Sequence, residues 1–291
     1  MLGVVGTIPA EELPLVVGPV SLGDGFLAVQ GHEAPLTRGT AALLAAAAVC
    51  LQALHQPPPL AFLAGDIGLG QGSTQLYEYL TLHLAAHQLR VLTLHYILPM
   101  VDWHHRVLWA IQEMAAPPLL IADAGYMYVA KMSGEAQAYD LFTPDAGEMA
   151  FLADEAAPHP FYTRGFILHE DNRIPDLITR AYAHDNAARH LLVKGQKDYV
   201  ATKEGILSVI DTPGIEALEP IGGTGDTLTG IAAALIAAGF DIVAAAILAA
   251  RVNRVAGALA QPTPATSVQE IVNHIPGALA TVLRSHQLGK E

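Results

Sequence analysis

The sequence predicts an α/β fold with a mostly parallel central sheet, and three observations support this. Short apolar runs that end in Gly, Asp or Pro alternate with helical stretches, which is the pattern of βαβ units. The 291 residues are 52% hydrophobic and only 15% charged, so the chain can bury a large core. Two β-rich segments, 198–202 and 206–210, flank the turn Lys203-Glu204-Gly205, which indicates an antiparallel hairpin at the sheet edge. Because no internal repeat or low-complexity linker interrupts the chain, we expect a single domain spanning residues 1–291.

The strands and helices are expected where the apolar pattern changes its period. Short buried runs predict strands at 15–20, 26–30, 60–64, 91–94, 119–122, 140–143 and 191–193. Helices between them are expected near 38–54, 74–88, 104–115, 147–153 and 175–188, and after the hairpin near 225–238 and 241–259. The capping box Ser267-Val268-Gln269-Glu270 predicts a C-terminal helix that Pro276 must kink or restart. Residues 154–176 are expected to form a long loop.

Composition excludes several classes of function. The formal net charge of −13 repels nucleic acid and anionic membranes, so we expect neither as a partner. The apolar segment 227–260 is broken by glycines and charged residues, and it predicts two buried helices rather than a membrane span. The single cysteine, Cys50, is expected to be buried, and with an N-terminus that lacks a basic signal region it favours a cytoplasmic setting. At this apolar composition we also expect a homo-oligomer.

The strongest local signal is the glycine-rich stretch from Ile221 to Gly230, which leads into an apolar helix. Glycines allow a sharp backbone turn, so the amides of Gly223, Thr224 and Gly225 can converge on one point. The following helix adds unpaired N–H groups and its positive dipole end, which makes that point an anion hole. A carboxylate in the first turn, Asp226, stays ionised there, as a base toward a substrate hydroxyl must.

Other interpretations of this stretch exist. Asp226 can instead be a simple helix cap in a glycine-rich turn. A Walker loop requires Gly-Lys-Ser/Thr, and no Lys follows these glycines. A dinucleotide fingerprint requires Gly where Leu228 stands.

A second signal is Thr143-Pro144-Asp145-Ala146-Gly147-Glu148, where a strand ends and a helix begins. Asp145 and Glu148 are three residues apart, so both can face the carboxyl end of the strand and hold Mg²⁺ or its water shell near a nucleotide. The alternative is a capping pair with Asp145 at the N-cap. A third signal is Lys194-Gly195 after a buried strand, where the lysine either meets a phosphate or is a solvated strand end.

These three pieces, in this order, resemble the ribokinase superfamily of small-molecule kinases. That family carries a Thr-Pro-Asn-x-x-Glu-like stretch, then a strand ending in Lys-Gly, then a Gly-x-Gly-Asp loop whose Asp is the base. The resemblance implies a three-layer α/β/α fold, with Thr143, Lys194 and Gly195 near the nucleotide. Asn253, on the helix after the glycine-rich loop, is expected either to line the base pocket or to be a buried, hydrogen-bonded side chain.

Within this superfamily the sequence is most similar to the NAD(P)H-hydrate dehydratases. Their Gly-Gly-Thr-Gly-Asp-x-Leu-x-Gly loop is matched at 222–230 and their Thr-Pro-x-x-Gly-Glu at 143–148. Their Asp at a strand end resembles Asp123, and their Gly-x-Gly-Leu-Gly segment resembles residues 66–70. The resemblance therefore adds substrate-binding candidates, which are Gly31, His32, Arg38, Gly68, Gly70 and Asp123.

The sequence also departs from the family pattern. Asp145-Ala146 stands where the family has His-Pro, and Pro220-Ile221 replaces Ala-Thr before the double glycine. The glycine segment at 65–70 lies further ahead of Asp123 than the family pattern implies. The likeness covers roughly residues 25–260 and is tighter from 141 onward.

The resemblance implies a two-step reaction that uses ATP or ADP and Mg²⁺. Asp226 orients or deprotonates the hydroxyl of hydrated NADH or NADPH for attack on the terminal phosphoryl group, and phosphate then leaves to restore the reduced cofactor. The anion hole and Lys194 stabilise the transferring group. Two alternatives stay open: a kinase for a sugar, a hydroxymethylpyrimidine or a related alcohol, and a nucleotide-binding protein without catalysis.

Overall fold

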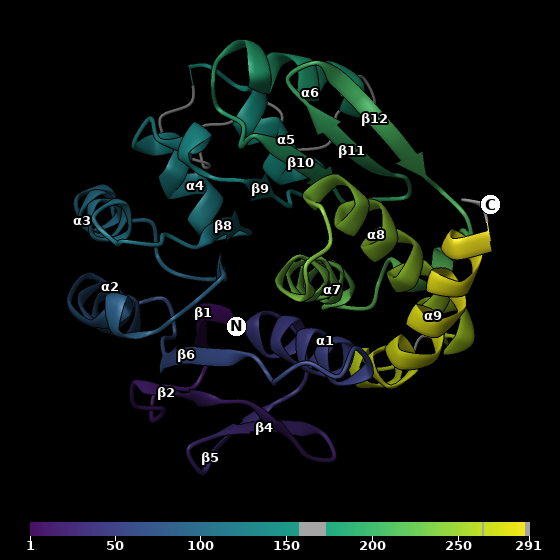
Figure 1. Cartoon of the computed structure of the whole chain (residues 1–291), viewed down its shortest axis with the longest axis horizontal. Helices are drawn as coiled ribbons and strands as arrows, with labels where there is room; N and C mark the ends of the chain where they lie inside the picture. The colour runs from purple at the N-terminus through teal and green to yellow at the C-terminus, as the bar shows by residue number, and fades with distance from the viewer. Residues whose placement is uncertain (157–172, 264, 289–291) are drawn as a thin grey trace.

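The computed structural model describes residues 1–156, 173–263 and 265–288, which form three layers around one long sheet (Figure 1). The strands lie in the order β12 (Gly205–Ile210), β11 (Asp198–Thr202), β10 (His190–Val193), β9 (Leu141–Phe142), β8 (Leu119–Ala122), β7 (Val91–Leu94), β1 (Leu2–Ile8), β6 (Leu60–Gly65) and β2 (Val16–Pro19). From β10 to β6 the neighbouring strands are parallel, and the pairings at both edges are antiparallel. The predicted α/β class and the hairpin at one edge are confirmed.

Two groups of helices cover the two faces of the sheet and enclose separate hydrophobic cores. On one face are α1 (Thr40–Ala53), α7 (Thr224–Ala238), α8 (Ile242–Leu259) and α9 (Val268–Leu288). On the other are α2 (Gln71–His83), α3 (Val101–Gln112), α4 (Gly125–Met132), α5 (Ala146–Ala153) and α6 (Ile174–Ala183). Short 3-10 turns lie at Leu84–Ala86, Ala136–Ala138 and Glu216–Leu218. A small antiparallel sheet of β3 (Ser21–Leu22), β4 (Phe26–Val29) and β5 (His32–Pro35) lies beside β2 in Figure 1.

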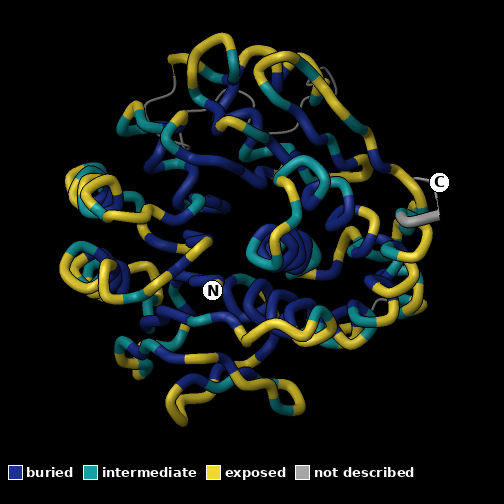
Figure 2. Tube along the Cα trace, in the orientation of Figure 1, coloured by how far each residue is buried: buried dark blue, intermediate teal, exposed yellow. Residues whose placement is uncertain are grey.

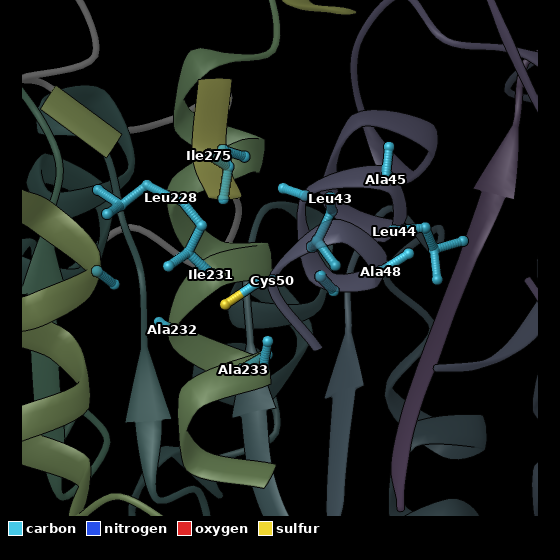
Figure 3. Close-up of a cluster of buried hydrophobic side chains, with 14 of the residues drawn as sticks. Leu43, Leu44, Ala45, Ala48, Cys50, Leu228, Ile231, Ala232, Ala233 and Ile275 are labelled. Atoms are coloured by element: carbon cyan, nitrogen blue, oxygen red, sulfur yellow. The ribbon is translucent and has the colours of Figure 1, made fainter. Parts of the chain in front are cut away.

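The helices α1 and α7 are buried along almost their whole length, as the dark tube in Figure 2 shows. Their small side chains allow close packing, and Leu43 and Cys50 of α1 lie beside Ile231 of α7 in Figure 3. At Gly230 a Cβ atom would lie 2.2 Å from the carbonyl oxygen of Leu43, so only glycine permits this approach. The predicted burial of Cys50 is confirmed, and burial raises the pKa of its thiol to about 12.

The helix α8 is long and apolar enough to cross a membrane by length and composition alone. Half of it is buried inside the molecule, where it packs against α7 and α9. Its Arg254 donates from Nε to Asp198 of β11 at 2.7 Å, in a buried ion pair. These contacts identify α8 as a core helix, as the sequence predicts for segment 227–260.

Several elements differ from the sequence expectation. The central strand β1 was not expected, because Gly3 and Gly6 weaken its strand pattern. The helix α4 and the short strands β3 and β5 were also not expected. Pro276 does not restart the C-terminal helix, which runs as one element through it. The expected loop at 154–176 falls mostly on residues 157–172, outside the described residues, and α6 already begins at Ile174.

Candidate active site

The candidate site lies where the carboxyl ends of β7, β8 and β10 meet the first turns of α1 and α7. Asp226 is in the first turn of α7, after Gly223, which adopts a left-handed φ of 99°. That conformation favours glycine and directs the loop amides toward the helix start. Arg38 lies against the same loop, since a Cβ atom at Gly223 would lie 3.2 Å from the Cα atom of Arg38.

Both carboxylate oxygens of Asp226 are held by donors. The amide of Gly39, at the start of α1, donates to Oδ2 at 2.7 Å, and Nε2 of His95 lies 3.1 Å from Oδ1. The side chain is only 14% exposed. Burial by itself raises the pKa of Asp226, but the hydrogen bond from His95, the charge of Lys194 and the Gly39 amide together lower it below its usual value. Asp226 is therefore ionised at neutral pH.

Asp123 and Lys194 form a buried ion pair beside Asp226. Nζ of Lys194 donates to the two oxygens of Asp123 at 2.8 and 2.9 Å. Thr229 of α7 also donates to Asp123, at 2.6 Å. Burial lowers the pKa of Lys194, but Asp123, Glu148 and Asp226 outweigh burial and raise it, so the ammonium stays charged. Lys194 is thus a buried cation in the site and not a solvated strand end.

The residue after Asp123 has an unusual backbone. Ala124 adopts φ 51° and ψ −134°, a conformation that L side chains rarely adopt, and its amide donates to Asp123 at 2.8 Å. Backbone strain of this kind costs on the order of 1–3 kcal/mol and is concentrated at functional sites. The strained residue directly follows Asp123, whose side chain pairs with Lys194.

A family sequence model described as NAD(P)H-hydrate dehydratase matches residues 81–276. The chain belongs to this family of enzymes. A protein of Methanocaldococcus jannaschii described as uncharacterized is 42% identical over 221 residues, which cover 76% of this chain and 90% of that protein. A bifunctional NAD(P)H-hydrate repair enzyme of Hyperthermus butylicus is 40% identical over 110 residues, which cover 36% of this chain and 20% of that enzyme.

Solved structures show the same fold as this family member. The ADP/ATP-dependent NAD(P)H-hydrate dehydratase of Bacillus subtilis, co-crystallised with ATP and Mg²⁺, has a TM-score of 0.56 at 15% identity, over 97% of this chain and 92% of that one. Phosphofructokinase-2 of Escherichia coli has a TM-score of 0.55 at 13% identity, over 96% and 99% of the two chains. At these identities the likeness concerns the fold, which is ribokinase-like.

The family match includes Asp123, Lys194 and Asp226, but it begins after the expected substrate residues Gly31, His32, Arg38, Gly68 and Gly70. Gly68 and Gly70 follow β6, and β1 and β7 separate that strand from β8, which precedes Asp123. At about 4.8 Å per strand, the two strand ends are roughly 14 Å apart. Asp66 accepts from the amides of Gly68 and Gly70 and from Ser73, so this segment is a capping loop for α2.

The other early candidates lie in different places. Gly31 and His32 are exposed at the turn between β4 and β5, and the described contacts bring neither to Asp226. Arg38, in contrast, lies against the glycine-rich loop, where its side chain would contact a Cβ atom at Gly222 at 3.7 Å. Arg38 is the member of this group that the structure brings to the site.

The expected nucleotide-binding residues Asn253, Thr143 and Gly195 are held by hydrogen bonds within the protein. Oδ1 of Asn253 accepts from Thr227 at 2.7 Å and its Nδ2 donates to the carbonyl of Thr224 at 3.0 Å, so it is a hydrogen-bonded side chain that ties α8 to α7. The hydroxyl oxygens of Thr143 and Thr229 lie 3.0 Å apart. The amide of Gly195 donates to Asp198 at 3.1 Å.

Asp145 and Glu148 form the capping box that the sequence offered as the alternative to a metal site. The Glu148 amide donates to Oδ1 of Asp145, and the Asp145 amide donates to Oε2 of Glu148, both at 2.8 Å. The second oxygen of each carboxylate takes no part in these two hydrogen bonds. Burial first, and then Asp123 and Asp145, raise the pKa of Glu148 to about 8 despite the opposing charge of Lys194. The carboxylates of Asp145 and Glu148 supply negative charge and oxygen ligands, which suit a hard divalent cation such as Mg²⁺.

His95 is the main site residue that the sequence reasoning missed. Its side chain is fully buried, and with Asp123 and Asp226 it forms a group whose possible metal-ligand atoms lie within 4.8 Å of one another. Lys194 already neutralises Asp123 there, so we interpret the group as an ion-pair and hydrogen-bond network. The available signal was a histidine directly after the buried strand β7, at the same sheet edge as Asp123.

A cavity of about 440 Å³ lies elsewhere, at the start of α3. It is lined by Met100, Val101, Asp102, Trp103 and Arg106. None of the carboxylates described above borders it. The hydrogen-bonded cluster around Asp226, rather than this cavity, has the groups that acid–base chemistry requires.

Proposed function

We propose that this chain is an ATP- or ADP-dependent NAD(P)H-hydrate dehydratase. The observation that supports this most strongly is the ionised, largely buried carboxylate of Asp226 at the start of α7, next to the buried ammonium of Lys194. A general base must be ionised and a transferring phosphoryl group requires positive charge beside it. The family to which the chain belongs supplies the substrate class.

In the first step the hydroxyl oxygen of the hydrated nicotinamide forms a bond to the terminal phosphorus of ATP or ADP. The bond from that phosphorus to the bridging oxygen breaks, and the shortened nucleotide leaves. Asp226 takes the hydroxyl proton, while the amides of Gly223, Thr224 and Gly225 and the charge of Lys194 stabilise the phosphoryl oxygens. Mg²⁺, held by Asp145 and Glu148 or through its water shell, supplies further charge neutralisation when bound.

In the second step the electron pair of the ring nitrogen expels the phosphate. Loss of a proton from the neighbouring ring carbon then restores the reduced nicotinamide. A saturated alcohol has no such electron pair, so the same site would leave a stable phosphoester on it. The substrate therefore decides whether this machinery acts as a dehydratase or as a kinase.

Tyr96 supports a substrate with a ring rather than a sugar alone. Its side chain is 48% exposed, and its ring lies edge-on to His95 with centroids 4.3 Å apart. Burial first, and then the charges of Asp226, Glu148 and Asp123, raise the pKa of the Tyr96 phenol. The Tyr96 ring also lies beside the start of α1, where a Cβ atom at Gly39 would be 3.5 Å from it. Tyr96 thus offers a partly open aromatic face beside the proposed base.

The test is to incubate the purified protein with NADH hydrate, Mg²⁺ and either ATP or ADP. Recovery of the absorbance of reduced nicotinamide, together with one phosphate released per cofactor restored, is the expected result. A stable phosphorylated product from a sugar or a hydroxymethylpyrimidine, with no recovery of reduced nicotinamide, would replace the dehydratase by a kinase. Nucleotide binding without turnover of either kind would leave the non-catalytic alternative.

We also propose that the protein works in the cytoplasm as a homo-oligomer. Leu207 and Val209 are exposed on the edge strand β12, and the structure of a tetrameric form of Escherichia coli phosphofructokinase-2 has the same fold at a TM-score of 0.53. Exposed apolar side chains on an edge strand favour pairing with another chain. Light scattering on the purified protein measures the number of subunits directly.

A further inference from the structure

His95 contacts the proposed base but has no part in the mechanism above. It follows β7 directly, its side chain is fully buried, and its Nε2 lies 3.1 Å from Asp226 and 3.7 Å from Asp123. On its other side, Nδ1 lies 3.0 Å from the hydroxyl of Thr40. We propose that His95 is a positioning residue that fixes the carboxylate of Asp226 through Nε2–H, and that Thr40 in turn fixes the imidazole.

The partners of the two ring nitrogens determine where the protons lie. Nε2 faces only carboxylate oxygens, which accept hydrogen bonds, so Nε2 must bear a proton. The hydroxyl of Thr40 has no other hydrogen-bond partner among the described residues, so it donates to Nδ1. A neutral imidazole with its proton on Nε2 therefore satisfies all these groups.

The arrangement is held by three separate elements of the fold. Thr40 is the first residue of α1 and packs on β1 at Gly6, where a Cβ atom would lie 2.4 Å from the threonine oxygen. The amide of His95 continues the pairing of β7 with β1 by donating to Val5 at 2.9 Å. The contact of Thr40 with β1 and the hydrogen bond of His95 to β1 therefore both limit the movement of the imidazole, which has a fixed direction.

The fixed direction of the imidazole restricts the orientation of the Asp226 carboxylate. One oxygen accepts from His95 and the other from Gly39, so the carboxylate cannot rotate freely. Each oxygen has a further lone pair for the proton of the substrate. The other charged or titratable groups facing this network are Asp123, Lys194 and Glu148, together with the phenol of Tyr96. The Nε2 atom of His95 lies 3.7 Å from Asp123 and 3.1 Å from Asp226, to which it donates.

The experiment compares His95→Leu with His95→Gln, and Thr40→Val with Thr40→Ser. Gln keeps an N–H donor close to the position of Nε2, and Ser keeps the hydroxyl, whereas Leu and Val remove the hydrogen bonds. The first measurement is the titration of the Asp226 carboxyl by ¹³C NMR in the full-length protein labelled at aspartate. We expect its pKa to rise by about one unit in His95→Leu and to stay close to the wild-type value in His95→Gln.

The second measurement is the dependence of kcat and KM on pH. In His95→Leu we expect kcat to fall on the order of tenfold to a hundredfold, with the acidic limb of the profile moved to higher pH and KM for the nucleotide within about twofold. His95→Gln is expected to recover most of the rate. Thr40→Val should move the profile in the same direction as His95→Leu, and Thr40→Ser should not.

His104 provides a matched control for the loss of a buried histidine. It is also fully buried and bonded at both nitrogens, to Tyr139 at 2.8 Å and Ser133 at 2.9 Å, but it shares no hydrogen-bond partner with Asp226 among the described residues. His104→Leu should leave the Asp226 titration and the pH profile unchanged. Equal shifts in His95→Leu and His104→Leu, or an unchanged Asp226 pKa in His95→Leu, would overturn the positioning role.

The inference rests on the proposed function only for the kinetic measurement. If the wild-type protein does not restore reduced nicotinamide, the proposed function fails, while the NMR titration still decides the role of His95. If His95→Leu does not fold, the pair Thr40→Val and Thr40→Ser tests the same hydrogen-bond chain from its other end.

Discussion

Asp226 is largely buried, yet it is surrounded by groups that favour its charged form. An isolated buried carboxylate would be neutral, because burial penalises the ion. The hydrogen bond from His95, the charge of Lys194 and the Gly39 amide reverse this effect and lower the pKa of Asp226. At the residue scale, the charged state of Asp226 therefore depends on contacts with Gly39 and His95, which lie 187 and 131 positions away in the sequence.

The substitution Asp226→Asn tests the base directly. The amide is nearly isosteric but cannot take a proton, so we expect kcat to fall at least about a hundredfold. The unfolding temperature should change by only a few degrees, since the amide oxygen still accepts one of the two hydrogen bonds. The measurements are steady-state turnover of NADH hydrate and thermal unfolding by circular dichroism.

Asp241→Asn is the matched control for this substitution. Asp241 also stands at a helix start, where it accepts from the amides of Val243 and Ala244, but it is exposed at α8. Asparagine caps helices as well as aspartate does, so neither activity nor stability should change appreciably. Near-normal turnover in Asp226→Asn would remove Asp226 from the role of base.

The helices α1 and α7 set the geometry of the site at the scale of elements. The start of α1 supplies the Gly39 amide and Thr40, and the start of α7 supplies Asp226. Their separation is limited by Gly230, which lies against the backbone of α1. Since protein interiors are densely packed, a change in this separation is transmitted to the distance between the base and its donors.

Gly230→Ala should therefore affect both stability and activity. The new Cβ atom would lie 2.2 Å from the Leu43 carbonyl oxygen, so α7 must move away from α1. Overpacking of this kind costs about 1–3 kcal/mol in the free energy of unfolding. Denaturant unfolding gives that cost, and kcat should fall in the same variant because Asp226 shifts from Gly39.

Gly277→Ala is the control for Gly230→Ala. Gly277 is also inside a helix, α9, but a Cβ atom there would meet nothing within 4 Å. Alanine is the better helix former, so this variant should be as stable as the wild type or more stable by up to about 1 kcal/mol. Equal losses in both variants would show that the α1–α7 contact is not the cause.

The buried His104 links the stability of the whole molecule to pH. Burial first, and then the neighbouring His105, lower the pKa of His104 to about 4 from its usual 6.5. Below pH 6.5 the unfolded chain binds a proton at this side chain and the folded chain does not, so stability falls as the pH decreases toward 4. Above pH 6.5 both states are neutral at His104 and the contribution is constant.

We expect His104 to account for a loss of about 3 kcal/mol in the free energy of unfolding between pH 7 and pH 4. His104→Gln lacks the titrating group, so its unfolding free energy should depend less on pH over this interval. Denaturant unfolding of both proteins at a series of pH values measures the difference. Parallel curves for the two proteins would show that His104 does not carry this dependence.

The sequence and the structure can also be compared at the scale of the whole chain. The βαβ alternation, the hairpin at 198–210 and the glycine-rich loop before Asp226 are local patterns, and each was expected from the residues alone. The strand β1 was missed because two glycines hide its pattern, and only the structure shows that β6, which precedes Gly68 and Gly70, lies three strand positions from β8, which precedes Asp123. The order of the strands in a sheet cannot be predicted from the local periodicity of the sequence.

The sequence by itself determined the α/β class, the family resemblance and the loop that presents Asp226, since propensity, turn chemistry and spacing act between neighbouring residues. Only the tertiary structure decided that His95 and Gly39 hold Asp226, that Lys194 pairs with Asp123, and that Asn253 ties α8 to α7. These contacts join residues far apart in the chain. They form only when packing of the buried helices and strands brings distant segments together, because side-chain contacts across a core leave no periodic trace in the sequence.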